Sequence, residues 1–584
     1  MTRQSDIIIL LVITIGILSS AFYAISWLFV YVPAILGCLC LIAFPSSNKN
    51  TIALLTACFV AYNLITILPL PQKIEKIVDG KYEIQNTEVR NIIAEAKKLG
   101  LTDNVSARLT LSRNKPGTMR MLLLVVAGIS MGGLATRLSI KGSIKCLRVV
   151  TIIGVIIALV GYIGQWIFPQ ERTILWFIPV EHGKPVACFI NRNHFGGFIA
   201  LLAPICAMFA SNAIQFKLTM QSLLWGTGFV VMTLATVMSL SRGALFAYLG
   251  GIMLILIISL IKRRWLAGLL MSLFVAIAIT AGLCLKEPSA IERLESFTTP
   301  ANDSSMKMRF DTWRDSLKIL KDYAIIGTGA NAFSMVFPQY RTSATRKSFK
   351  HAENEYIEWL VEYGIIGTFI LLAIIIGFFI MTWRRKALDT MNKMPKYAVA
   401  GALVSAGIHA GVDFALRVPV YFITLCILAG VSVSNDISNK NCSINKLFSE
   451  TPSKTQRHLP ILPVLGSLLT IIISLVYNYN SEYEKSKFLT EANPAQLCQA
   501  LVSCPVSWQA WYHLGRRALE WQNEEAIKFG EKCIAKATEY DPLNYRVWTE
   551  LAKIRLGHGD IAGAKYAYSR AKELRKWIKI EELE

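Results

Sequence analysis

The chain has 584 residues, of which 53% are hydrophobic and 17% are charged, and its mean hydropathy is +0.44. This much apolar surface excludes a soluble globular protein and favours a polytopic membrane protein. The net charge of +22 is spread over many short loops instead of one patch or arm, so we expect no nucleic-acid partner. The 12 cysteines form no CxxC pair and no zinc or iron–sulfur spacing.

Apolar segments are candidate transmembrane helices, because roughly 20 residues are needed to cross the hydrocarbon core. In chain order they cover residues 7–25, 27–44, 51–68, 119–137, 147–168, 194–211, 222–240, 243–261, 265–285, 357–382, 397–414, 418–434 and 460–478. The first two could form one kinked hairpin, so we expect about 12–13 crossings. The predicted fold is all-α, a polytopic membrane helix bundle followed by a C-terminal α-helical domain.

Basic residues gather in alternate connecting loops, as in 262–264 and 384–386. Lys and Arg mark the cytoplasmic loops of membrane proteins, so this alternation predicts a cytoplasmic N-terminus. The long loops 69–118, 169–193 and 286–356 then face outward, together with everything after about residue 479.

Four regions follow from this pattern. We expect N-terminal transmembrane helices with the first outer loop (1–118), a transmembrane core with the outer loop 286–356 (119–435), a cytoplasmic linker with the last transmembrane helix (436–479), and an extracytoplasmic helical domain (480–584). In the longest outer loop, residues 308–323 have apolar side chains at helical spacing. Gly327, Gly329 and Asn331 then predict an end to that helix.

The last hundred residues carry an internal repeat. Trp511 and Trp548 are 37 residues apart (548 − 511), and Pro505 and Pro542 precede them at the same offset. This period is near the tetratricopeptide value of about 34, which predicts a small array of helical hairpins that binds protein partners or docks on the membrane domain. The alternative is a generic α-helical tail.

Two cysteines lie at the entry to this array. Cys498 and Cys504 are six residues apart (504 − 498), and an outward-facing tail would place them in an oxidising compartment. They form either a short-range disulfide or two independent thiols. We expect Cys533, which lies in a helical stretch, to stay reduced.

Three residues on the outer side have the chemistry to act on a phosphate. Arg242 lies where two spans meet with almost no loop, Arg309 opens the helix of the outer loop, and His351 closes that loop. Arginine forks bind phosphate oxygens bidentately, and a neutral histidine accepts a proton from a hydroxyl. The alternatives are an interfacial anchor for Arg242, a solvated face for Arg309 and a helix cap or solvent position for His351. Two further cations of the loop, Arg341 and Arg346, are candidates to hold phosphate.

Several segments together form a recognisable pattern across residues 100–435. They are Phe189–Gly197, Ser239–Gly243, Arg309–Trp313 with Ile326–Gly329, His351–Tyr356 with Glu362–Gly367, and His409 with Asp413, Phe414 and Pro419. In this order and spacing they resemble the O-antigen ligase and polymerase superfamily, bacterial inner-membrane enzymes that act on undecaprenyl-diphosphate-linked glycans. Many relatives have a second histidine where this chain has Glu353, which leaves open whether Glu353 shares the proton with His351.

The resemblance implies an inverting, metal-independent glycosyltransferase without a cofactor. His351 would be the general base, and Arg242 and Arg309 would hold the diphosphate. Further candidates for substrate binding are Arg192, His194, Glu353, Asn354 and Asp413. The donor would be an undecaprenyl-diphosphate-linked glycan in the membrane lipid, and the acceptor another glycan or a lipid A core. The C-terminal domain would be periplasmic, and a partner surface there slightly favours a polymerase.

Two other functions are less consistent with the sequence. A lipid-linked glycan transporter is expected to carry ionisable groups at mid-membrane, whereas here they lie at the outer edge. A membrane scaffold for polysaccharide export would make the C-terminal array the active part, but it does not account for Arg242, Arg309 and His351.

Overall fold

The computed structural model describes residues 3–23, 26–43, 51–69, 71–78, 80–103, 105–167, 173–175, 178–179, 184–262, 265–284, 304–343, 349–384, 394–433 and 486–581. Within these residues the regular structure is helical apart from one short antiparallel pair, β1 (Thr173–Ile174) and β2 (Ile178–Pro179), in which Thr173 lies opposite Pro179. The all-α prediction is confirmed. The 460–478 segment and Arg346 lie outside the described residues.

Twelve of the expected apolar segments coincide with helices. They are α1 (Arg3–Ala21), α2 (Tyr31–Ala43), α3 (Thr51–Ile67), α6 (Lys115–Ala135), α7 (Ile140–Ile167), α8 (Arg192–Gln215), α9 (Thr219–Met238), α10 (Arg242–Lys262), α11 (Leu266–Cys284), α16 (Glu355–Arg384), α17 (Met394–Ala410) and α18 (Pro419–Ser432). Within the described part of the chain, seven are long and apolar enough to cross a membrane, namely α1, α6, α7, α8, α9, α10 and α16. Shorter apolar helices cover Trp27–Ala43, Leu54–Ile67 and Pro419–Ser432.

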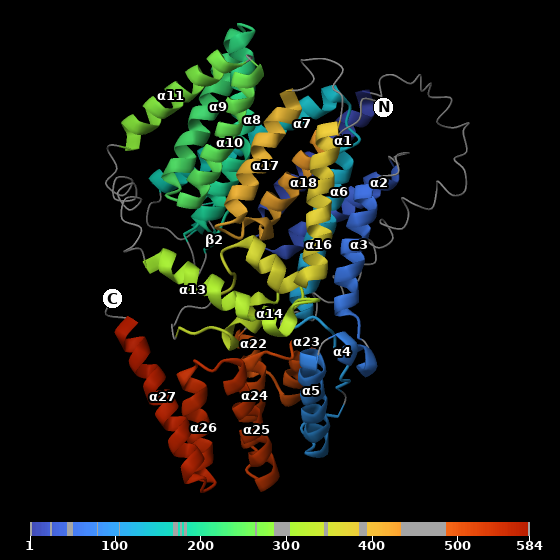
Figure 1. Cartoon of the computed structure of the whole chain (residues 1–584), viewed down its shortest axis with the longest axis vertical. Helices are drawn as coiled ribbons and strands as arrows, with labels where there is room; N and C mark the ends of the chain where they lie inside the picture. The colour runs from blue at the N-terminus through green and yellow to red at the C-terminus, as the bar shows by residue number, and fades with distance from the viewer. Residues whose placement is uncertain are drawn as a thin grey trace, which may run out of the picture.

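The bundle is organised around α8. Its apolar window is 89% buried, whereas that of α16 is only 11% buried. Small residues bring α8, α10 and α17 close together, because a Cβ added to Gly251 of α10 would lie 2.7 Å from Pro204 and 2.8 Å from the carbonyl of Gly401. Helix α16 therefore lies at the periphery of the bundle, where it packs on α3 (Figure 1).

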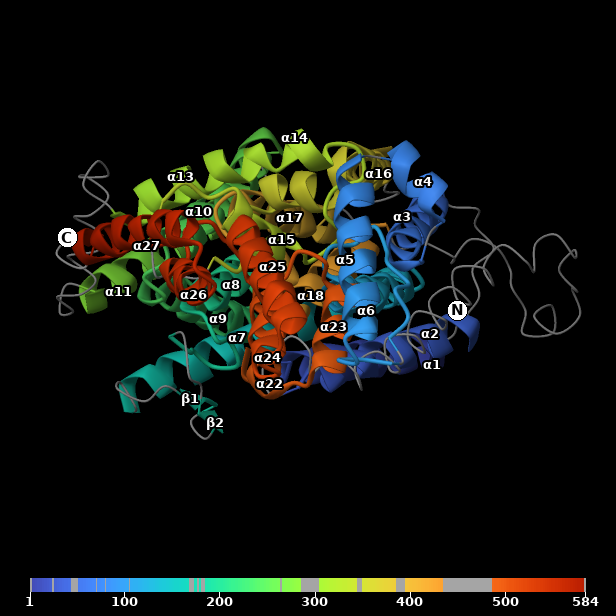
Figure 2. The same cartoon turned by 90° about the horizontal axis from the view of Figure 1, so that it is seen from below.

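The remaining helices gather at one end of the bundle (Figures 1 and 2). From the first long loop come α4 (Gln72–Val78) and α5 (Gly80–Lys98). From the long loop 286–356 come α13 (Ser304–Lys318), α14 (Leu320–Tyr323), α15 (Phe333–Val336) and the 3-10 turn η3 (Phe337–Gln339). The same end holds α22 (Ser486–Glu491), α23 (Pro494–Ser503), α24 (Trp508–Leu519), α25 (Glu524–Tyr540), α26 (Tyr545–Gly557) and α27 (Ile561–Glu581). Two further 3-10 turns, η1 (Trp27–Val30) and η5 (Ala415–Arg417), precede α2 and α18.

The C-terminal helices are two tandem hairpins, α24 with α25 and α26 with α27. The repeat seen in the sequence has a structural counterpart. The indole N–H of Trp511 donates to the carbonyl of Pro505 at 2.9 Å, and Trp548 donates to the carbonyl of Pro542 at the same distance. Equivalent positions of the two units thus make equivalent contacts, as expected for a helical-repeat array.

These hairpins pack on helices of the long loops 69–118 and 286–356. Buried side chains of α5, α15, α23 and α24 belong to one apolar cluster, which includes Val89, Phe333, Leu497 and Trp511. Ion pairs border it, with Lys536 2.6 Å from Glu88 and Lys532 2.6 Å from Glu95. The C-terminal region and the loops that carry the candidate site therefore form a continuous body.

The cysteines of this region are thiols. Cys498 is buried in α23 and Cys504 lies at its C-terminal end, and neither of them forms a disulfide, nor does the buried Cys533. Of the two alternatives, the structure has independent thiols.

Candidate functional site

The site forms where α16 begins, and two glycine-containing segments fix that point. The chain around Gly327 lies against a break in α16 at Gly364, where the backbone leaves helical geometry (φ 59°, ψ −167°). A Cβ on Gly327 would clash with the backbone nitrogen of Gly364. The N–H of Thr328 donates to the carbonyl of Val361 at 2.9 Å, and the hydroxyl of Tyr62 donates to the carbonyl of Tyr363 at 2.7 Å. Segments that are separate in the sequence thus hold the first turns of α16 in place.

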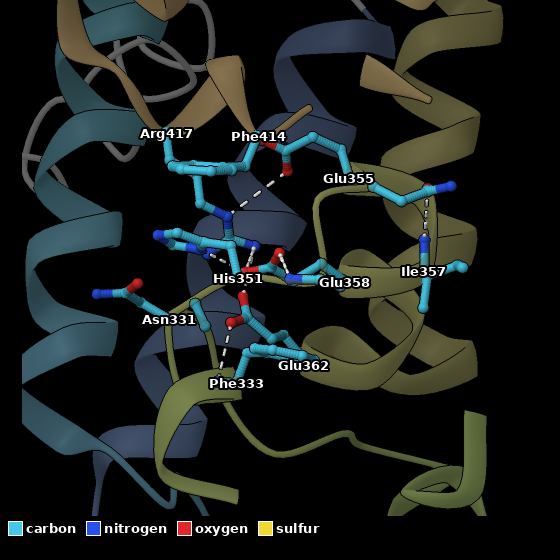
Figure 3. Close-up of polar contacts among 12 residues, drawn as sticks. Asn331, Phe333, His351, Glu355, Ile357, Glu358, Glu362, Phe414 and Arg417 are labelled. Carbon is cyan, nitrogen blue, oxygen red and sulfur yellow. Dashed lines mark hydrogen bonds and ion pairs between the residues drawn. The ribbon is translucent and has the colours of Figure 1, made fainter. Parts of the chain in front are cut away.

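His351 is oriented by a carboxylate on those turns. Its Nδ1 lies 2.8 Å from Oε1 of Glu358, and the other oxygen of Glu358 accepts from the N–H of Ala352 at 3.0 Å (Figure 3). The imidazole stacks on Phe414, with ring centroids 4.1 Å apart. An ionised carboxylate only accepts hydrogen bonds, so Nδ1 carries the proton and Nε2 keeps a free lone pair. That arrangement suits a general base.

Glu358 belongs to a buried cluster around Arg417. The guanidinium of Arg417 lies 2.9 Å from Glu362, 3.1 Å from Glu358 and 3.6 Å from Glu355 (Figure 3). Because a buried carboxylate is stable as an ion only when it is paired and hydrogen-bonded, Arg417 keeps Glu358 charged beside His351. Sequence reasoning did not select Arg417 or Glu358. The signal in the sequence is the spacing of Glu355, Glu358 and Glu362, which places three carboxylates on one face of a helix and so calls for a cation against that face.

Arg309 reaches the same site from α13. Its Nη2 donates to Oε2 of Glu353 at 2.8 Å, and its Nη1 donates to the carbonyl of Val412 at 2.9 Å. The neighbouring Trp313 donates its indole N–H to the carbonyl of Ala352 at 2.8 Å, which ties α13 to the segment of His351.

Arg242 is the first residue of α10 and is half-buried. The next residue, Gly243, lies against Val412, because a Cβ added there would be 2.8 Å from its side chain. Arg309 binds the carbonyl of that same Val412. The α10 N-terminus and Arg309 therefore flank one turn, between α17 and η5.

A histidine–aspartate pair lies behind this turn. Nε2 of His194, on the first turn of α8, is 3.2 Å from Oδ1 of Asp413, which also accepts from the N–H of Phe414 at 2.7 Å. The Phe414 ring separates the two histidines, since it stacks on His351 and meets His194 edge-on at a centroid distance of 4.6 Å. Burial alone would raise the pKa of Asp413, but His194 and the hydrogen bonds hold it well below its usual range.

Of the other candidates, Arg192 and Asn354 lie near this site and Arg341 does not bind there. Arg192 opens α8, two residues before His194. The side-chain oxygen of Asn354 accepts from the N–H groups of Tyr356 and Ile357, so it caps α16. Arg341 pairs with Asp541 of the C-terminal region at 2.9 Å. Among the residues whose positions the structure gives, no group of three or more His, Cys, Asp and Glu side chains could hold a metal ion.

The site combines an oriented histidine, two arginines and a buried acid at one end of a membrane bundle. Residues 227–372, which contain Arg242, Arg309 and His351, match the O-antigen ligase family. No curated protein matches the chain. This family implies a glycosyltransferase with lipid-linked glycan substrates, and it suggests O-antigen ligase or polymerase-type glycan transfer. The protein is a multi-pass membrane protein that carries an O-antigen ligase family domain.

Proposed function

We propose that the protein transfers a glycan from undecaprenyl diphosphate to an acceptor hydroxyl, as an inverting glycosyltransferase. The observation that supports this most is the orientation of His351 by Glu358, next to Arg309. The hydroxyl attacks the anomeric carbon and forms the new C–O bond, while the bond from that carbon to the phosphate oxygen breaks. The electron pair leaves with the diphosphate, and the hydroxyl proton passes to Nε2 of His351.

The arginines supply the electrostatic part of this reaction. Charge grows on the bridging phosphate oxygen as the bond breaks, and guanidinium groups that are already in place stabilise it without reorganisation. Arg309 and Arg242 flank the same turn, so we assign both to the diphosphate. The C-terminal hairpins favour a polymerase that works with protein partners over a ligase.

The test is glycan transfer in membranes from a strain that lacks the native gene. His351→Ala should lower the rate by about 10² to 10⁴ at matched expression, because a general base is lost. His558→Ala is the control, since His558 lies in the C-terminal hairpins and comes no nearer than 3.9 Å to its partner Glu531. Lipid-linked glycan should accumulate only with His351→Ala. Transfer within a few-fold of the parent would remove His351 from the mechanism. Lipid-linked glycan that crosses the membrane without reaching an acceptor in the parent would favour a transporter instead.

A further inference from the structure

Glu353 adopts an unusual backbone conformation beside the catalytic histidine. Its φ is +58°, in the left-handed region that residues with a Cβ rarely occupy. Such a conformation persists only where the surrounding contacts stabilise it, and it is commonest at functional sites.

The carboxylate of Glu353 and the carbonyl of Val412 share the fork of Arg309. Nη2 of Arg309 donates to Oε2 of Glu353 at 2.8 Å, and Nη1 donates to the carbonyl of Val412 at 2.9 Å. The Glu353 side chain keeps 34% of its surface exposed, against 21% for Arg309. Carboxylate and phosphate oxygens compete for the same guanidinium donors. A diphosphate that binds Nη2 of Arg309 therefore competes with Glu353 for that nitrogen.

The charges around Glu353 determine what happens to it after displacement. Arg309 faces it from α13, His194 from α8, Asp413 from the turn after α17, and His351 from its own segment. Burial and then the nearby Asp413 raise the pKa of Glu353, while Arg309 and the two histidines oppose this. Once Arg309 turns to the diphosphate, Glu353 loses its closest cation and gains a second anionic neighbour. Both changes favour the neutral acid.

We propose that Glu353 is a resident counter-ion that holds Arg309 in the absence of donor, is displaced by the donor's diphosphate, and takes up a proton from solvent as it leaves. This inference rests on the proposed function, because it assumes that Arg309 binds the diphosphate. The displaced neutral acid can donate its O–H to a phosphate oxygen. Glu353 thus weakens donor binding, because it competes for Arg309, and it couples donor binding to the uptake of a proton.

The sign of the pH dependence follows from this linkage. Binding raises the pKa of Glu353, so the complex holds a proton that the free protein lacks between the two pKa values. Donor affinity therefore falls as the pH rises through that window and is constant above and below it. A Glu353 variant lacks this carboxyl, so the proton uptake that it loses relative to the parent measures the linkage through Glu353.

The experiment is calorimetric binding of farnesyl diphosphate to the purified full chain, in pairs of buffers with different ionisation enthalpies. Glu353→Gln should tighten binding by roughly tenfold and reduce the proton uptake, because the amide is neutral and competes less well for Arg309. The matched control is Asp311→Asn on α13. Asp311 has the same 34% exposure, but it pairs with Arg314 instead of Arg309. The control should bind like the parent.

Three results would overturn the inference. If Glu353→Gln binds equally or more weakly with unchanged proton uptake, Glu353 only positions Arg309, and the proposed function stands. If Asp311→Asn tightens binding as much, the effect is general removal of negative charge. If the parent binds no farnesyl diphosphate, the diphosphate clamp itself is wrong, and the proposed function fails with it.

Discussion

Nδ1 of His351 lies 2.8 Å from Oε1 of Glu358, so the proposed base and the carboxylate that orients it are joined by a direct hydrogen bond. Glu358→Gln keeps the shape and removes the charge that stabilises the imidazolium. We expect the rate to fall roughly 10²-fold and the acidic limb of the pH–rate profile to move to lower pH, because His351 becomes less basic.

The control for that change is Glu362→Gln. Glu362 shares Arg417 with Glu358, but its second oxygen accepts from the N–H of Phe333 at 3.2 Å instead of contacting the imidazole. It should lower stability and leave the pH profile unchanged. Identical profiles for both variants would mean that Glu358 has only a structural role.

Arg309 and Arg242 are expected to act through fork geometry as well as charge. Arg309 uses two of its nitrogens in two directions, and lysine cannot make both contacts. Lysine at either position should raise the KM for the donor by about tenfold or more. Arg314→Lys, at an exposed pair on the same helix as Arg309, should have no effect. Near-normal donor kinetics for both variants would show that charge alone suffices or that neither residue contacts phosphate.

Gly327→Ala should destabilise the site. Its φ of +77° disfavours alanine and the added Cβ would meet the backbone of α16, so we expect a loss of about 1–3 kcal/mol. Gly226→Ala in α9 is the opposite case, because nothing lies within 4 Å of an added Cβ, and helix propensity predicts a gain of up to about 1 kcal/mol. Thermal unfolding in detergent measures both. Equal stabilities would contradict the contact at Gly364.

Arg341 has two candidate roles. The sequence suggests that it binds phosphate, whereas the structure shows an ion pair with Asp541. If the pair is what matters, Arg341→Met and Asp541→Asn should both loosen the C-terminal hairpins and increase their cleavage by protease, because each leaves a buried group without its partner. Donor KM should change little in either. A rise in KM confined to Arg341→Met would assign that residue to the substrate.

The orientation of the bundle remains a prediction from its basic loops. Alkaline phosphatase fused after Glu584 should be active, and a fusion after Lys386 should be inactive. The reverse result would place the site in the cytoplasm. The structure adds a constraint, because the outer loops and the C-terminal hairpins lie at the same end (Figure 1). A fusion in either should therefore report the same side.

Local patterns predicted more of this protein than long-range ones. Hydropathy located the helices, and the Pro505–Trp511 spacing recurs as a repeated hydrogen bond, because both depend on neighbours in the sequence. Arg417 could not be paired in advance with Glu362, since 55 residues separate them and only the fold brings α16 and η5 together. The apolar run after Tyr356 likewise predicted one uninterrupted crossing, and the break at Gly364 depends on the loop around Gly327.

That break changes how much of α16 has to enter lipid. The 20 residues from Ile365 to Arg384 rise about 30 Å at 1.5 Å per residue, which equals the hydrocarbon thickness. The nine residues before Gly364 are then not needed to cross the membrane. The side chains of Glu355, Glu358 and Glu362 therefore do not have to enter the hydrocarbon core, where burying a carboxylate would be unfavourable. The segment after Gly364 is therefore no longer than the membrane crossing requires. Removing a few residues there should draw Glu362 toward the lipid and select against insertion of the protein.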